Sequence, residues 1–124
     1  MKHLLERVAS AMWPGAAAPH RGARAGVYKV YARIEEPLMA ERRMKKYQHP
    51  LHSALMLARQ GHVTSGGSVQ GTDGTIQWIS IEMVLKDLDG ALHFACGKLR
   101  ELGAPAGSVV KFQRAGTEVV LPIR

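Results

Sequence analysis

The sequence predicts an α+β domain, with one antiparallel sheet covered by helices on a single face. Residues 27–36 and 75–85 alternate apolar and polar side chains with the two-residue period of half-buried strands. Residues 50–60 and 88–102 instead place apolar side chains three and four positions apart, as helices do. At 124 residues and 46% hydrophobic content, the chain is one domain long and can bury a core.

The first 26 residues are predicted to stand outside this domain. Residues 3–12 have the apolar period of a short amphipathic helix, and prolines and glycines from Pro14 to Gly26 then indicate a flexible tether. We therefore divide the chain into residues 1–26 and a folded domain over residues 27–124. The apolar side chains expected to mediate self-association through this helix are Leu4, Leu5, Val8 and Met12.

The domain is expected to begin with a strand over residues 27–36, followed by a basic loop and a helix. The polar side of the strand carries Lys29, Tyr31 and Arg33. Pro50 suits the first turn of a helix, and Gly61 closes the apolar pattern that follows it. The cations of the basic loop are Arg42, Arg43, Lys45 and Lys46.

The segment GHVTSGGSVQGTDGT, residues 61–75, contains five glycines and invites comparison with a phosphate-binding loop. A Walker-type loop needs a lysine and a hydroxyl residue after its last glycine, and then a helix, whereas Gly67 is followed by Ser68 and Val69. We therefore interpret the segment as one arm of a hairpin. Glycines within a strand also mark bulges or close backbone approach, so a partner contact at an edge strand remains an alternative.

The second arm of the hairpin is a strand over residues 75–85, which directs Trp78, Ser80 and Glu82 away from its apolar side. Asp87 or Asp89 can cap the next helix, whose apolar stripe ends before Gly103. Residues 107–123 are expected to form a last hairpin that turns at residues 115–116, and Pro122 indicates that its final strand lies at an edge or ends there.

The order of strand, helix, strand, strand, helix and strand is that of the ferredoxin-like, or split βαβ, arrangement with one added C-terminal strand. Right-handed crossovers would place both helices on one face of the sheet and leave the other face open. The runs PLHSALMLARQGHVTSGGS, GTIQWISIEMVLKDLDGAL and LRELGAPAGSVVKF also resemble a group of small bacterial accessory and immunity-type proteins, over roughly residues 27–123. That resemblance implies action by binding and assigns no site residues.

Composition narrows the classes of function. The net charge of +7 favours association with polyanions, whether nucleic acid, lipid head groups or an acidic protein. Cys96 is the only cysteine, which excludes an intrachain disulfide or a thiolate metal cluster. No apolar run is long enough to span a membrane, and Glu6 and Arg7 interrupt any signal-peptide pattern, so we expect a cytoplasmic protein.

Two groups of residues have both a chemical and a structural interpretation. His49 and His52 have a spacing that can share a metal ion, but no Asp, Glu or Cys stands near them in sequence. His62, Ser80 and Glu82 could form a catalytic group on the open face, although an ion pair of Glu82 with Lys29 or Arg33 explains that residue equally well. We expect no metal, no cofactor and no enzymatic activity.

Two surfaces remain as candidates for binding. On the open sheet face, the aromatic rings of Tyr31 and Trp78 among cations suggest stacking of nucleic-acid bases or a protein interface. On the helices, apolar side chains outside the predicted core stripes suggest self-association, and these are Met56, Leu57 and Phe94. We expect a protein-binding module, either a homodimer or an immunity-type inhibitor of an acidic partner, with single-stranded nucleic-acid binding as the alternative.

Overall fold

The computed structural model describes residues 27–124, and the predicted N-terminal helix and tether lie outside the described residues. The chain enters strand β1 (Tyr28–Ile34) and continues into a helical run. This run consists of α3 (Ala40–Arg43), the π-helical turn η2 (Met44–Gln48) and α4 (His49–Leu57). The elements that follow are β2 (Gly61–Gln70), β3 (Ile76–Leu85), α5 (Leu88–Glu101), β4 (Val109–Arg114) and β5 (Thr117–Pro122).

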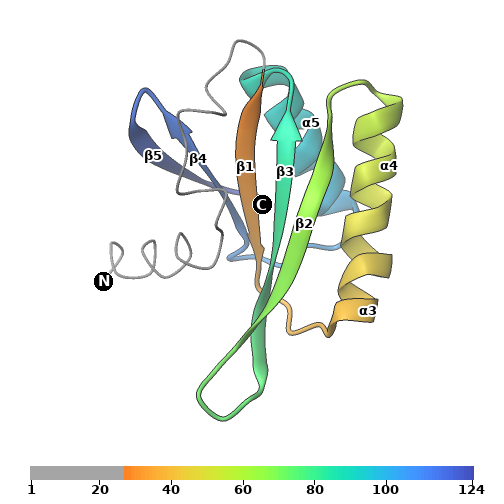
Figure 1. Cartoon of the computed structure of the whole chain (residues 1–124), viewed down its shortest axis with the longest axis vertical. Helices are drawn as coiled ribbons and strands as arrows, with labels where there is room; N and C mark the ends of the chain where they lie inside the picture. The colour runs from red at the N-terminus through yellow and green to blue at the C-terminus, as the bar shows by residue number, and fades with distance from the viewer. Residues whose placement is uncertain (1–26) are drawn as a thin grey trace.

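The five strands form one open antiparallel sheet in the order β2-β3-β1-β4-β5 (Figure 1). Helices α4 and α5 contact each other and share one hydrophobic core with the sheet, so both lie on the same face. The predicted α+β class is confirmed. In the described residues, β2 and β5 are the two edges of the sheet.

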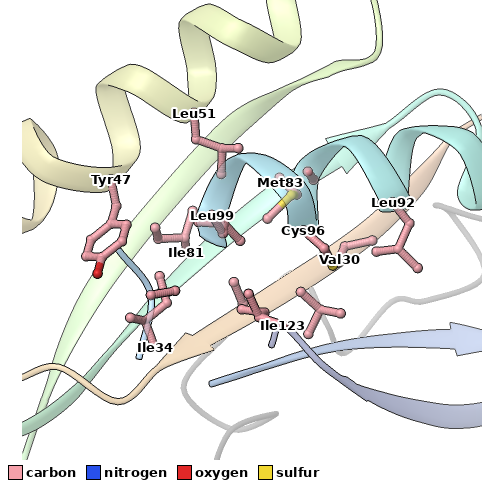
Figure 2. Packing of buried hydrophobic residues seen from close by; sticks show 14 of the residues in the cluster. Val30, Ile34, Tyr47, Leu51, Ile81, Met83, Leu92, Cys96, Leu99 and Ile123 are labelled. Atoms are coloured by element: carbon pink, nitrogen blue, oxygen red, sulfur yellow. The ribbon is translucent and has the colours of Figure 1, made fainter. Parts of the chain in front are cut away.

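The core lies between the sheet and the two helices (Figure 2). Alternate residues of the central strands supply it, including Val30 and Ile34 from β1 and Ile81 from β3, as the two-residue period predicted. Burial also encloses Cys96 and raises the pKa of its thiol, so this side chain serves as a small buried hydrophobe. Tyr47 is a core residue that the sequence interpretation missed.

The basic segment before Pro50 was predicted as a loop, and this prediction is wrong. The helical run begins at Ala40 and continues through Pro50 to Leu57. In the π-helical turn, the His49 amide bonds to the carbonyl of Met44, five residues earlier. This wider turn accommodates Pro50, which has no N–H to donate and whose ring crowds the preceding turn of a regular α-helix.

The predicted cap of α5 and the predicted turn between β2 and β3 are confirmed. The Asp87 carboxylate accepts a hydrogen bond from the Gly90 amide at 2.9 Å and caps α5. The Gly71 amide bonds to the Thr75 carbonyl at 2.8 Å, which closes the turn between β2 and β3. None of the helices within residues 27–124 is both long and apolar enough to cross a bilayer.

Candidate functional site

The sheet face opposite α4 and α5 holds a row of polar side chains across four strands, and it is here called the helix-free face because no helix of residues 27–124 packs on it. Antiparallel register places Ser65 opposite Glu82, Glu82 opposite Tyr31, and Tyr31 opposite Lys111. Glu82 and Lys111 are each only 9% exposed. The predicted candidates on β1 and β3 therefore do share one face, but these two charged side chains are buried there.

Glu82 lies at the centre of this row. Its Oε1 accepts a hydrogen bond from Ser65 Oγ at 2.9 Å, and its Oε2 lies 3.6 Å from Lys29 Nζ. Burial, and then the nearby Glu82 carboxylate, raise the pKa of Tyr31, so the phenol stays protonated at physiological pH. The predicted ion pair of Glu82 with Lys29 is present, whereas Arg33 pairs with Glu35 instead.

Trp78 is 8% exposed and does not project freely from the sheet. The guanidinium carbon of Arg33 lies 4.2 Å from the centroid of the Trp78 ring, which is the geometry of a cation–π contact. One face of the ring is thus occupied by a cation of the same chain. Tyr31 and Trp78 are also separated, because Glu82 is the β3 residue opposite Tyr31.

The residues considered for catalysis are placed apart. Ser80 is buried and its hydroxyl lies 3.5 Å from the Gly67 carbonyl, while Glu82 is engaged by Ser65 and Lys29. The His62 ring instead packs edge-on against His52, with ring centroids 6.5 Å apart. Within residues 27–124, no three His, Cys, Asp or Glu side chains are grouped so that they could hold a metal ion.

The four cations predicted for a basic loop have four different environments. Lys46 Nζ lies 2.7 Å from Glu36, which Tyr47 also contacts, so its charge is largely compensated. Lys45 is loosely paired with Glu41 at 3.7 Å and is well exposed. Arg42 is exposed, and its charge helps to lower the pKa of the Glu36 carboxyl. Only Arg42 and Lys45 therefore present substantial positive charge to solvent.

Arg43, the fourth cation, is 9% exposed and has neutral partners. Its Nε donates to Gln48 Oε1 at 2.6 Å and its Nη1 donates to Ser68 Oγ at 2.8 Å. Burial lowers the pKa of the guanidinium, which nevertheless stays charged because arginine begins from a very high value. Arg43 thus joins the helical run to β2 and does not form part of a solvent-exposed basic patch.

The residues predicted for self-association also differ in how exposed they are. Phe94 is only partly buried and packs against the core, so little of it remains for a partner. Met56 and Leu57 are 56% and 87% exposed at the end of α4. Leu4, Leu5, Val8 and Met12 lie outside the described residues.

Two neighbouring rows of side chains run along the helical run, each at four-residue spacing. The outer ridge is exposed throughout and consists of Lys45, His49, Ser53 and Leu57. The inner ridge lies toward β2 and consists of Met44, Gln48, His52 and Met56. Sequence reasoning recognised the apolar end of both ridges but missed Met44, because the helix was not expected to extend that far.

Comparison of the chain with models of protein families, with curated proteins and with solved structures gave no match.

Proposed function

We propose that the chain is a non-enzymatic protein-binding module and that its outer ridge, together with Arg42, binds an acidic partner protein. The observation that carries this proposal is the exposure of Leu57, at 87%, beside the exposed Met56 and on the same helical run as the exposed cations Arg42 and Lys45. Adjacent exposed apolar side chains offer area that a partner can bury, and cations around them steer an acidic partner toward that contact.

The dimensions of this surface fit a protein interface. At about 1.5 Å per residue, the helical run from Arg42 to Leu57 spans about 22 Å. A standard interface buries about 800 Å² on each partner, which corresponds to a patch roughly 30 Å across. Burying a leucine side chain contributes about 1.5–3 kcal/mol, so Leu57 would act as the main apolar anchor.

We also propose that the domain is a ferredoxin-like, split βαβ fold with β5 added at one edge. The strand order supports this assignment, because β3 lies between β1 and β2 while β1 lies between β3 and β4. Two interleaved crossovers with helices on one face produce that order. An immunity-type inhibitor would use such a domain as a rigid support and occlude an acidic surface of its partner through α4.

Single-stranded nucleic-acid binding on the helix-free face has less support. A base-stacking platform needs aromatic rings whose faces are accessible, and Arg33 already covers one face of Trp78. The Glu82 carboxylate beside Tyr31 would also repel a phosphate backbone. Both features favour the protein partner.

The protein proposal can be tested by capture with matched variants of the full chain. Tagged wild-type protein, Leu57→Asp, Arg42→Glu and the control Thr117→Asp, which changes an exposed residue of the opposite edge strand, are incubated with lysate of the source cells. We expect an acidic protein that the wild type and the control retain and that both α4-side variants lose. The purified partner should then bind the wild type with an affinity that falls as salt rises. If no retained protein distinguishes Leu57→Asp from Thr117→Asp, the proposal is wrong.

The nucleic-acid alternative has its own measurement, a titration of a labelled single-stranded oligonucleotide at two salt concentrations. Stacking on Trp78 would make Trp78→Ala cost about 1–3 kcal/mol of binding free energy. Binding that ignores this substitution but weakens steeply with salt would reflect charge alone. We expect no dependence on Trp78.

A further inference from the structure

The helix-free face is more deeply buried than the solvent side of a sheet usually is. Helices α4 and α5 share the hydrophobic core on the opposite face, and no helix of residues 27–124 packs on this one. The open face of an antiparallel sheet normally keeps its polar side chains in water. Four side chains of this face are nevertheless buried, and these are Trp78, Ser80, Glu82 and Lys111.

Lys111 is the most informative of these residues. It is 9% exposed, and it belongs to neither of the ion pairs on this face, which join Lys29 to Glu82 and Arg33 to Glu35. Lysine is almost never so deeply buried unless it is paired. Its methylene stem can, however, lie beneath an apolar layer while the ammonium group reaches water at the margin of that layer.

Apolar side chains beside Lys111 offer further area to such a layer. Three half-buried valines lie on the same face of the sheet, and these are Val84 on β3, Val109 on β4 and Val120 on β5. Together with the stem of Lys111 and the ring of Trp78, they form a surface that extends across the sheet from β3 to β5. An apolar covering segment would bury all of these groups at once.

Residues 1–26 are well placed to reach this surface. They directly precede β1, which is the central strand of the sheet, so the segment joins the sheet at its middle. Strands lie about 4.8 Å apart, so the edge strands are only about 10 Å from β1. When extended, residues 13–26 alone span about 45 Å. Attachment to β1 also gives the segment an effective concentration at this face on the order of millimolar.

The composition of residues 1–26 suits an apolar cover. Alanines and glycines are frequent between positions 15 and 26, and such small residues allow a chain to approach a sheet closely. Larger apolar side chains precede them, and these are Leu4, Leu5, Val8, Met12 and Trp13. Because the segment has a net charge of +3 and the face carries three cations, the contact is expected to be apolar and not electrostatic.

We propose that residues 1–26 cover the helix-free face of their own chain, with residues 13–26 crossing the row from Glu82 to Lys111. The segment then forms a third layer, on the side of the sheet opposite the helices. While it is bound, this face is closed to nucleic-acid bases and to other proteins. The outer ridge lies on the helical side, so this contact and the acidic-partner interface can fail independently.

Trypsin measures whether the segment is bound, because cleavage after Arg21 requires its release from the face. In the full chain this cleavage should be at least about tenfold slower than in a synthetic peptide of residues 1–26, since the rate follows the released population. Val84→Lys and Val120→Lys each place a charge in the proposed contact and should raise the rate toward that of the peptide. Leu57→Lys, on the outer ridge, is the matched control and should leave it unchanged. Circular dichroism verifies that each variant folds.

A nitroxide attached to Ala17→Cys in the full chain locates the segment. The native thiol of Cys96 is buried and reacts slowly with the label. In NMR spectra, the nitroxide should broaden the methyl signals of Val84 and Val120 more strongly than those of Leu57. When the nitroxide and the isotope label are on different copies of the chain, this broadening should disappear.

Several results would overturn the proposal. One is cleavage after Arg21 that is as fast in the full chain as in the peptide. Another is cleavage that accelerates in Leu57→Lys but in neither valine variant, which would place the segment on the helices. Broadening that is equal for Leu57 and the valines would exclude the face, and broadening in the mixed sample would assign the cover to a second copy of the chain.

Discussion

At the scale of single residues, Gly66 and Gly67 show why the same amino acid can be required at one position and replaceable at the next. They lie on opposite faces of β2, and a Cβ at Gly66 would meet Gln48 Oε1 at 2.3 Å while a Cβ at Gly67 would meet Ser80 Oγ at 3.4 Å. Gln48 cannot simply move aside, because its Oε1 accepts the 2.6 Å bond from the buried Arg43. The requirement for glycine at position 66 therefore comes from Arg43.

We expect Gly66→Ala to lower the free energy of unfolding by about 1–2 kcal/mol, since it displaces a hydrogen bond to a charged group. Gly67→Ala is the matched control and should change the free energy of unfolding by less than about 0.5 kcal/mol. Alanine lowers the backbone entropy of the unfolded chain, and this gain offsets the tight contact in the folded state. Chemical denaturation at low protein concentration measures both. In a Gln48→Ala background, the cost of Gly66→Ala should largely disappear. Equal costs for the two glycines would contradict this explanation.

At the scale of elements, the sequence predicted helices and strands wherever the periodic spacing of apolar side chains was uninterrupted. Alternation placed β1 and β3 correctly, and the glycine-rich segment was correctly interpreted as a hairpin arm. The start of the helical run was missed because Pro50 resembles a helix start and four cations resemble a loop. A longer signal was present in the four-residue spacing of Arg43, Tyr47, Leu51 and Leu55, all of which are buried. An arginine within that spacing obscured it.

The pairing of charged residues was harder to predict than their faces. Alternation along β1 is enough to predict the face on which Lys29 lies. The ion pair between Lys46 and Glu36, in contrast, depends on how the segment between β1 and α3 folds back, which alternation does not specify. Likewise, the role of His52 at the edge of β2 requires α4 and β2 to be neighbours, which no local pattern specifies. The sequence could therefore predict which residues share a face, but not which of their side chains remain available to a partner.

The contact between α4 and β2 gives a prediction at this scale. His52→Leu keeps the approximate volume of the side chain but removes the acceptor for the Val63 amide. We expect hydrogen exchange of that amide, followed by NMR at a mildly alkaline pH, to accelerate about tenfold, which corresponds to roughly 1.4 kcal/mol of lost protection. His49→Leu, on the outer ridge of the same helix, is the control and should leave the Val63 amide unchanged. Unaltered exchange in His52→Leu would show that the imidazole does not protect the edge.

At the scale of the whole molecule, the two ridges of the helical run differ in their surroundings. The inner ridge lacks Lys and Arg and lies beside β2, whereas the outer ridge combines Lys45 with the exposed Leu57. A net charge of +7 disfavours the close approach of two copies across most of the surface. The same charge favours an acidic partner.

The homodimer expected from the sequence predicts how thermal stability depends on protein concentration. If unfolding requires dissociation of a dimer, mass action raises the melting temperature with total concentration, by about 3–5 °C per tenfold increase for a domain of this size. Met56→Lys should flatten that dependence, because Met56 is one of the exposed apolar side chains expected to mediate self-association and a lysine there would oppose apolar contact. Thr117→Lys, which changes an exposed residue of the edge strand β5, is the control and should melt with the slope of the wild type. Calorimetry over two decades of concentration separates these cases, and a concentration-independent melting temperature for the wild type would show that the folded chain does not associate under those conditions.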